Sequence, residues 1–161
     1  LYPFMCIIIV MQKQIWGNAT WFILHVLAEK LRPESEHIIP HLIHHIESLC
    51  ANLPCPDCAD HASRLFSTAN LSTIKDRESL RKFLYELHKL VNEKLGKHTP
   101  SYSECNQLYA RGNTNKIIRH FFAVMANIRS HDKAMIYGFR RTQCLQGFAH
   151  FLDAHSEFFN P

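Results

Sequence analysis

The sequence has little glycine, no apolar run long enough to cross a membrane, and no block of like charges. Five glycines among 161 residues are few for a sandwich or barrel, and abundant Leu, Ile, Phe and Ala favour helices. The apolar run over residues 4–11 is far shorter than the roughly twenty residues that a membrane span needs. It also lacks the basic start and the cleavage site of a secretory signal. We therefore expect no membrane span.

Charge and cysteine content narrow the class further. The formal charge of +4 is spread along the chain, which gives no basic patch for nucleic acid. Six cysteines are too few for a disulfide scaffold at this length. Histidine is unusually frequent, with twelve residues. With 47% apolar and 20% charged residues, the chain is typical of one soluble globular domain with a real core.

Apolar residues recur at helical spacing along most of the chain, and no strand-like alternation is visible. Asn18 and Asp76 are candidate N-caps, and Gly96 stands where a left-handed helix stop belongs. Residues 1–13 are expected to form an N-terminal extension or strand. We predict an all-α antiparallel bundle with helices over residues 18–31, 36–51, 54–66, 77–95, 102–110, 115–128 and 141–157. Prolines allow a later start for two of them, at Pro40 for the second and at Pro56 for the third.

The chemistry is concentrated in the segment Leu53-Pro-Cys-Pro-Asp-Cys-Ala-Asp-His61. Cys55 and Cys58 have the spacing that allows a short disulfide or a shared metal. Pro54 and Pro56 suit the first turn of a helix, where a missing N–H costs nothing. At a helix N-terminus the macrodipole favours a thiolate. The segment therefore predicts a reactive dithiol.

Three other interpretations of this segment were weighed. Zinc could take Cys50, Cys55, Cys58 and His61 as ligands, in a helical interaction module, but structural zinc sites usually join two separated ligand pairs. A thioredoxin-like motif needs a strand before the cysteine pair, and the preceding residues have helical periodicity. Two inert buried cysteines fit poorly with the polar, proline-marked surroundings. A dithiol facing a bound cofactor inside the bundle is favoured.

Polar and aromatic side chains on two of the expected helices suit such a cofactor pocket. Trp21 can stack on a flat ring, and His25, His88 and Asn92 can hydrogen-bond to heteroatoms. Taken singly, each is more often an ordinary core residue. Their occurrence together with the cysteine pair is what points to a cofactor.

Three blocks, in this order, resemble the Erv/ALR family of FAD-linked sulfhydryl oxidases. Residues 16–25 (WGNATWFILH) are similar to its WGxxxWxxLH motif, residues 55–61 (CPDCADH) to its CxxCxxH motif, and residues 88–97 (HKLVNEKLGK) to its HNxVNxxLGK motif. The resemblance covers residues 14–111 and is most like the viral members, including those of large DNA viruses.

The resemblance implies a four-helix bundle with a short fifth helix that binds FAD and forms a homodimer. Residues 14–111 would be the FAD-binding oxidase domain, and residues 112–161 an additional helical extension. Cys55 and Cys58 would be the catalytic pair, with no metal. The implied cofactor-binding residues are Gly17, Trp21, His25, His88, Val91, Asn92, Leu95, Lys97 and Tyr109.

The implied reaction is thiol–disulfide exchange followed by electron transfer. A dithiol protein substrate, or a thioredoxin-like partner, would reduce the Cys55–Cys58 disulfide, and Cys58 would pass electrons to the flavin. Oxygen would accept them and give hydrogen peroxide. The viral resemblance implies the host cytoplasm or the virion as the location, rather than the mitochondrial intermembrane space.

Some positions depart from the family pattern. Lys89 stands where many members have Asn, which removes one expected cofactor hydrogen bond. Cys105 lies near the first position of a second family disulfide, but its close partner is missing. It is expected either to be free or to pair with Cys144. Cys50 is expected to be a small buried apolar residue. Residues 112–161 are expected to pack on the bundle or to dock a redox partner.

Overall fold

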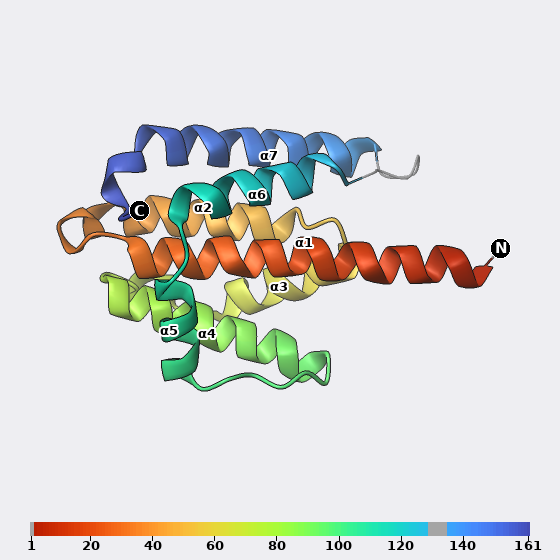
Figure 1. Ribbon diagram of the computed structural model, residues 1–161, viewed down its shortest axis with the longest axis horizontal. Coiled ribbons are helices and arrows are strands. Elements are labelled where there is room, and N and C mark those ends of the chain that lie inside the picture. The colour runs from red at the N-terminus through yellow and green to blue at the C-terminus, as the bar shows by residue number, and fades with distance from the viewer. Residues whose placement is uncertain (1, 129–134) are drawn as a thin grey trace.

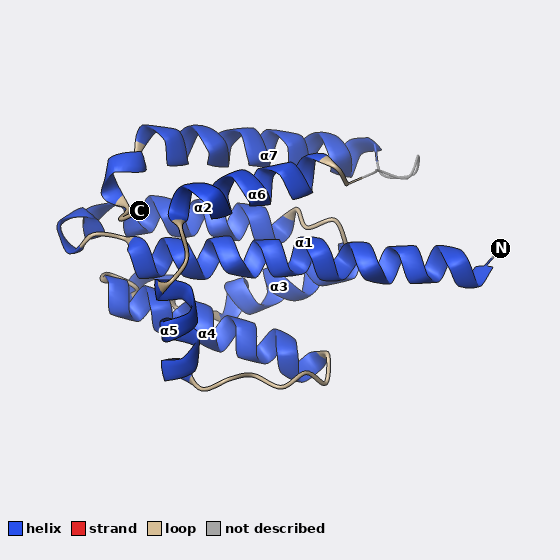
Figure 2. Ribbon diagram, in the orientation of Figure 1, coloured by secondary structure: helices blue, strands red, loops and turns tan. Residues whose placement is uncertain are grey.

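A computed structural model describes residues 2–128 and 135–161, with side chains from residue 10 to 128 and from 138 to 161. This part of the chain is helical and contains no named strand; its single β-bridge joins Leu31 to Phe159 (Figures 1 and 2). The α-helices are α1 (Tyr2–Lys30), α2 (Ile39–Ala51), α3 (Pro56–Thr68), α4 (Arg77–Lys94), α5 (Tyr102–Ala110), α6 (Thr114–Ala126) and α7 (Met135–Ala154). Short 3₁₀ helices are η1 (Pro33–Ile38), η2 (Leu71–Thr73) and η4 (Ser156–Phe158). The all-α prediction is confirmed.

Helix α1 is the central element of the molecule. It packs against α4, α5 and α6, while α2 packs against α3 and α7 (Figure 1). Within α1, Ile23, Leu24 and Leu27 are fully buried, and on α2 Leu42 and Ile46 are as well. One hydrophobic cluster joins these residues to Leu80 and Leu84 of α4 and to Phe121 and Phe148 of the last two helices. The bundle therefore has one main core.

The predicted start of the first helix was wrong. Asn18 is exposed inside α1 and does not cap it, and residues 2–13 belong to the same helix, so the strand considered for this segment is not formed. Helical backbone bonds run through the Gly17-Asn18 step, and the Thr20 hydroxyl donates to the Trp16 carbonyl at 2.7 Å. A Gly-Asn pair costs some helix propensity, which the buried residues on either side offset.

No described helix has the length and apolar character that a membrane span requires.

Two starts were predicted for the second helix, near Glu36 or near Pro40, and the observed start agrees with the later one. The 3₁₀ helix η1 begins at Pro33, and α2 follows from Ile39 with Pro40 in its first turn, where a proline is tolerated. The apolar stripe of α2 is buried as expected, since Ile39, Leu42 and Ile46 have no exposed surface.

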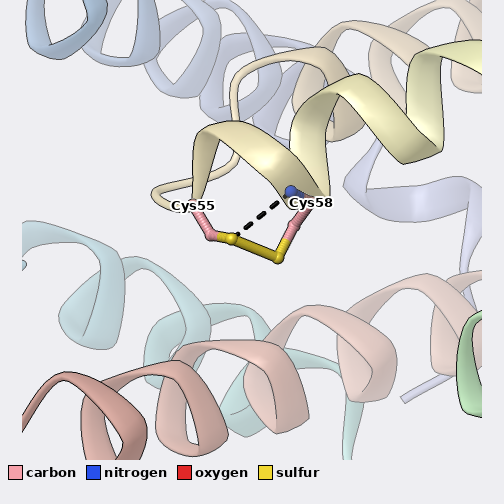
Figure 3. Close-up of a disulfide and its surroundings, with 2 residues drawn as sticks. All are labelled: Cys55 and Cys58. Atoms are coloured by element: carbon pink, nitrogen blue, oxygen red, sulfur yellow. Dashed lines mark hydrogen bonds between the residues drawn. A yellow bond between two sulfur atoms is a disulfide. The ribbon is translucent and has the colours of Figure 1, made fainter. Parts of the chain in front are cut away.

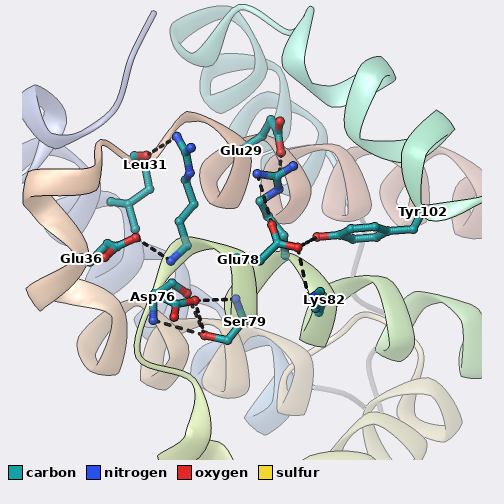
Figure 4. A network of polar contacts seen from close by, with 10 residues as sticks. Glu29, Leu31, Glu36, Asp76, Glu78, Ser79, Lys82 and Tyr102 are labelled. Atoms are coloured by element: carbon teal, nitrogen blue, oxygen red, sulfur yellow. Dashed lines mark hydrogen bonds and ion pairs between the residues drawn. The ribbon is translucent and has the colours of Figure 1, made fainter.

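Polar contacts fix the start of α4 against α1 and η1 (Figure 4). The Asp76 carboxylate accepts from the Ser79 N–H at 2.7 Å, and the Ser79 hydroxyl in turn contacts the Asp76 N–H, so the predicted cap is confirmed as part of a capping box. The Arg77 N–H donates to Glu36 at 2.8 Å, and Arg81 pairs with Glu29 of α1 at 2.8 Å. These contacts orient α4 along α1, where the candidate site residues lie.

The C-terminal helices are part of the main core and do not form a separate unit. Phe121 of α6 and Phe148 of α7 have no exposed surface, and Phe151, Leu152 and Phe159 are buried. The last residues return to the end of α1, where the Asn160 N–H donates to the Lys30 carbonyl at 2.7 Å. The packing role expected for residues 112–161 is therefore seen in the described part of that segment.

Candidate active site

The Cys55–Cys58 pair opens helix α3 and forms a disulfide, with the two Cα atoms 5.2 Å apart (Figure 3). Cys55 is the N-cap, Pro56 occupies the first turn, and the Cys58 N–H points at the Cys55 sulfur over 3.3 Å. Backbone N–H groups and the macrodipole at this end stabilise negative charge on either sulfur after reduction. The prediction that the pair begins a helix is confirmed.

Both sulfur-bearing side chains are half-buried and pack against the main core. The same core includes Trp16 and Ala19 of α1, and Trp21 packs on its edge. In Figure 3 the two side chains extend from α3 toward the neighbouring helices. The disulfide is therefore held at the boundary between core and solvent, where a thiol exchange partner can reach it.

Four of the predicted cofactor-binding residues form one ring cluster across α1, α4 and α5. The Trp21 and His88 rings stack with centroids 3.9 Å apart and planes 8° from parallel. His25 stacks on Tyr109 at 4.4 Å, and its Nε2 atom lies 3.0 Å from Nδ1 of His88. Residues from three separate segments thus meet at one place.

Burial keeps both histidines of this cluster neutral. Desolvation, with a further contribution from His88, lowers the pKa of His25 to about 3. Desolvation and the positive charge of Lys97 lower the pKa of His88 to about 4. Burial raises the pKa of the Tyr109 hydroxyl to about 12. Near neutral pH the cluster therefore offers neutral imidazole nitrogens and a neutral phenol, which can donate or accept hydrogen bonds without carrying charge.

The other predicted cofactor-binding residues lie on α1 and α4 or directly after the end of α4. Gly17 is half-buried one turn before Trp21, and a Cβ added there would meet nothing within 4 Å. Asn92 is buried one turn after His88, Val91 is half-buried, and Lys97 is exposed just beyond the helix end. None of the described side-chain contacts joins Gly17, Val91 or Leu95 to the ring cluster. Their role in binding the cofactor therefore stays a prediction.

Leu95 corrects one detail of the predicted packing of α4. Helical spacing puts Leu95 on the same face as the buried Leu80 and Leu87, but Leu95 is 46% exposed at the C-cap of α4. Residues 93–98 are all exposed, so the described helices do not cover this end of α4.

Thr99 was missed by the sequence interpretation. The Asn92 side chain donates to the Thr99 hydroxyl at 3.1 Å, and the Lys97 N–H donates to the Asn92 carbonyl at 2.8 Å. Thr99 lies in the loop after α4, where periodicity gives no signal, so only the fold reveals this contact. It holds the Asn92 amide in a fixed orientation beside His88.

Among the other cysteines whose side chains are described, Cys50 lies on α2 and Cys144 on α7, whereas Cys105 packs against Tyr109 of the ring cluster; His61 lies on α3. Cys50, Cys105 and Cys144 are free thiols, so Cys105 does not pair with Cys144. Cys50 is buried, as expected. Burial, with the charges of Lys94 and Arg64, lowers the pKa of His61. Within residues 2–128 and 135–161, no group of three or more His, Cys, Asp or Glu is arranged to hold a metal.

The chemistry of these residues fits FAD. A half-buried indole on the core edge offers a flat apolar surface, two neutral imidazoles and a buried amide offer hydrogen bonds to ring and ribose atoms, and Lys97 offers a counter-charge for phosphate. The two described hollows lie elsewhere; the larger, about 430 Å³, is lined by α2 and the η2 segment. The donor set at the ring cluster, together with a redox disulfide packed against the same main core as Trp21, is therefore the better candidate site.

Comparison with known proteins agrees with this assignment. The model of the Erv1 / Alr family matches residues 18–112. A FAD-linked sulfhydryl oxidase of African swine fever virus (isolate Tick/Malawi/Lil 20-1/1983) is 30% identical over 107 residues, which cover 63% of this chain and 86% of that protein.

A protein of Invertebrate iridescent virus 3, named by inference for the same activity, is 33% identical over 86 residues, which cover 52% of this chain and 58% of that protein. The chain thus spans little more than half the length of that relative. No solved structure gives a significant match. The family match covers more than half of the chain. It includes all three sequence motifs, except for Trp16 and Gly17 at the start of the first one. The chain therefore belongs to the Erv1/Alr family of FAD-linked sulfhydryl oxidases.

Proposed function

We propose that this chain converts dithiols of a protein substrate, or of a thioredoxin-like partner, to disulfides through Cys55 and Cys58, with oxygen as the final electron acceptor. The observation that carries the proposal is the Cys55–Cys58 disulfide at the start of α3, beside the core that also supports Trp21. Membership of the Erv1/Alr family gives FAD as the cofactor.

In the exchange steps, a substrate thiolate attacks the Cys55 sulfur, and Cys58 leaves as a thiolate in the first turn of α3. The second substrate thiolate then attacks the substrate sulfur of the mixed disulfide, and Cys55 leaves. The Cys58 N–H, 3.3 Å from the Cys55 sulfur, stabilises the charge on that leaving group. The substrate dithiol has then been oxidised to a disulfide, and the Cys55–Cys58 disulfide has been reduced to two thiols.

When bound, FAD would supply a two-electron acceptor for the reduced cysteine pair and a two-electron donor for oxygen. Trp21, His25, His88 and Asn92 would hold it, with Lys97 as the counter-charge of its phosphates. The low pKa values of His25 and His88 keep a second and third positive charge away from the cluster at neutral pH. Half-buried packing around the cysteine pair limits the access of water to the thiolates.

The test combines a visible spectrum with oxygen consumption. The purified protein should be yellow and should consume oxygen with dithiothreitol, while Cys58→Ser should keep its flavin and lose turnover. Cys144→Ser is the matched control, because that free thiol lies on α7, away from the ring cluster, and its loss should leave turnover with dithiothreitol unchanged. Normal turnover in Cys58→Ser would overturn the proposal. A colourless protein that unfolds with a chelator would favour the zinc module instead.

We further propose that the active form is a homodimer. Met11, Ile15 and Phe22 recur at helical spacing on α1 and are 57%, 53% and 40% exposed, which leaves an apolar stripe open to solvent. A second copy of the chain would cover such a stripe symmetrically. Sedimentation should give twice the monomer mass, and Ile15→Glu should give the monomer; a wild-type monomer at working concentration would contradict this.

We propose the host cytoplasm or the virion as the site of action, on the ground that the relatives compared above are viral. Fractionation of infected cells followed by detection of the chain tests this, and recovery in mitochondria would contradict it.

A further inference from the structure

Two thiols that the proposed function does not use lie on neighbouring helices. Cys50 is in the last turn of α2, Cys144 is near the middle of α7, and α2 packs directly on α7. Both are free in this structure. Cys50 is 4% exposed within the main core, and Cys144 is half-buried against that core.

The contacts between the two helices place the thiols at the same level of the interface. The Ser48 hydroxyl on α2 donates to the Cys144 sulfur over 3.4 Å. Farther along, His45 faces Phe148 at 5.9 Å and Phe151 at 4.6 Å. Higher residue numbers on α7 thus meet lower numbers on α2, so the helices are antiparallel and Cys144 faces the end of α2 that carries Cys50.

The two thiols differ in reactivity. Burial, with smaller contributions from Cys144 and Glu47, raises the pKa of the Cys50 thiol to about 12. Burial also raises the pKa of Cys144, but the Ser48 hydrogen bond offsets part of that rise. Cys144 is also the more exposed of the two. It is therefore the thiol that can react first with an outside disulfide.

We propose that Cys50 and Cys144 form a second, reversible disulfide that fastens helix α7 to helix α2. The packed pair of helices and the Ser48–Cys144 contact carry this inference, which does not rest on the proposed oxidase activity. In the described residues Cys55–Cys58 is the only disulfide present. The proposed Cys50–Cys144 bond would therefore form on oxidation of the two thiols.

The oxidant is a disulfide, either of a small molecule or Cys55–Cys58 of a second copy. The Cys144 thiolate attacks one sulfur of that disulfide, and the other sulfur leaves as a thiolate. Cys50 then loses its proton and attacks the Cys144 sulfur, and the first sulfur of the oxidant leaves. Two protein thiols are oxidised to one disulfide, and one oxidant disulfide is reduced to two thiols.

Such a bond would act on the segment that leads into the redox pair. Only the loop of residues 52–54 separates α2 from Cys55. A covalent tie between α7 and the end of α2 would restrict local opening of this segment, because α7 could no longer separate from it. The redox state of the second pair would thereby set the rigidity of the support beneath the first.

The experiment is thiol trapping with peptide mapping on the full chain. The protein is reduced, the reductant is removed, and oxidised glutathione is added before the remaining thiols are alkylated. A peptide linking Cys50 to Cys144 should appear beside the Cys55–Cys58 peptide, and alkylation at both positions should be lost together. Cys50→Ala and Cys144→Ser should each abolish the linked peptide, while Cys105→Ser should leave it.

The Cys55–Cys58 peptide is the internal control for oxidation. If it forms while Cys50 and Cys144 remain fully alkylated, the inference is overturned, and the proposed oxidase activity is untouched. A stable linkage of Cys144 to glutathione without transfer to Cys50 also overturns it. Failure of the oxidase test with the Cys50–Cys144 peptide present would leave this inference standing.

Ser48 gives a second, kinetic test. Ser48→Ala removes the hydrogen bond to Cys144 and should slow formation of the linked peptide at neutral pH without lowering its final amount. Ser67→Ala is the matched control, since the Ser67 hydroxyl bonds only to Arg64 on exposed α3 surface. An equal rate in the two variants would show that Cys144 is not the attacking thiol.

Discussion

His25 Nε2 and His88 Nδ1 lie 3.0 Å apart, although 63 residues separate the two histidines in the chain. One proton must lie between these nitrogens for a hydrogen bond to form, which excludes the state in which both rings are protonated. Trp21 covers His88 on one side and Tyr109 covers His25 on another. The pair is thus the centre of the candidate cofactor site and the point where its charge is controlled.

Acid should destabilise the fold through this pair. The pKa values of His25 and His88 fall from an ordinary value of 6.5 to about 3 and about 4 in the folded chain. Below pH 6.5 the unfolded chain binds protons that the folded chain does not, so stability is full above 6.5 and is lost as the pH falls toward 4. Each histidine should cost about 1.4 kcal/mol per pH unit within this window.

Urea unfolding at several pH values measures this effect. His88→Gln stays neutral at every pH, so the difference in free energy of unfolding between wild type and variant should shrink from pH 7 to pH 5. His120→Gln is the control, because His120 is exposed on α6 and should leave the pH dependence unchanged. A difference that stays constant over this range would mean that the fold does not lower the pKa of His88.

Gly17→Ala should act on stability and on cofactor binding in opposite directions. Gly17 lies inside α1, and an added Cβ would meet nothing within 4 Å, so alanine should stabilise the chain without FAD by about 0.5–1 kcal/mol. If the family prediction for this position holds, the added methyl group should also weaken FAD binding.

Thermal unfolding without FAD and a flavin fluorescence titration test the two halves separately. Gly147→Ala is the matched control on α7, where an added Cβ would lie 4.0 Å from His45 Cε1. Neither Gly147 nor His45 belongs to the ring cluster. It should stabilise the protein and leave FAD affinity unchanged. Unchanged affinity in Gly17→Ala would remove Gly17 from the predicted site.

Gly96→Ala should destabilise the chain, although space is available for the methyl group. Gly96 has φ of +66°, and the Lys97 and Gly96 N–H groups donate to the Asn92 and Glu93 carbonyls in the manner of a Schellman stop. An L-residue in this left-handed region costs roughly 1–2 kcal/mol. Denaturant unfolding should show this loss, and Gly96→Asn should lose less because asparagine tolerates the conformation; equal losses would argue against conformational strain as the cause.

Phe148→Ala should show that α7 belongs to the bundle. Phe148 has no exposed surface and contacts Phe121 and Phe122, so its removal should cost about 3–5 kcal/mol of unfolding free energy. Phe139 on the same helix is 63% exposed, and Phe139→Ala should change stability by roughly 0.5 kcal/mol or less. Similar effects of the two variants in urea unfolding would mean that α7 does not share the core.

The elements that the sequence predicted best are those with local signals. The cap at Asp76, the stop at Gly96 and the start of α3 at the cysteine pair depend on residues within a few positions of one another. The first helix was placed too late, because Gly17-Asn18 has the pattern of a helix start, while the packing that carries α1 through it comes from distant helices.

Contacts between remote segments needed the fold. Thr99 beside Asn92 lies in a loop without periodicity, and the exposure of Leu95 depends on how far its neighbours extend. Cys144 was considered as a partner of Cys105, but it lies at α2 beside Ser48. Sequence spacing gives no information on which of four remaining thiols meet, because helix packing decides that.

The sequence by itself determined the helical class, the redox pair at a helix start and the family motifs, since each follows from residue type and short-range spacing. Only the tertiary structure decided that His25 meets His88, that Tyr109 stacks on His25, and that the last two helices complete the core. The physical reason is that burial and side-chain contact depend on how helices pack over long sequence distances, and a local pattern fixes only which face of each helix is apolar.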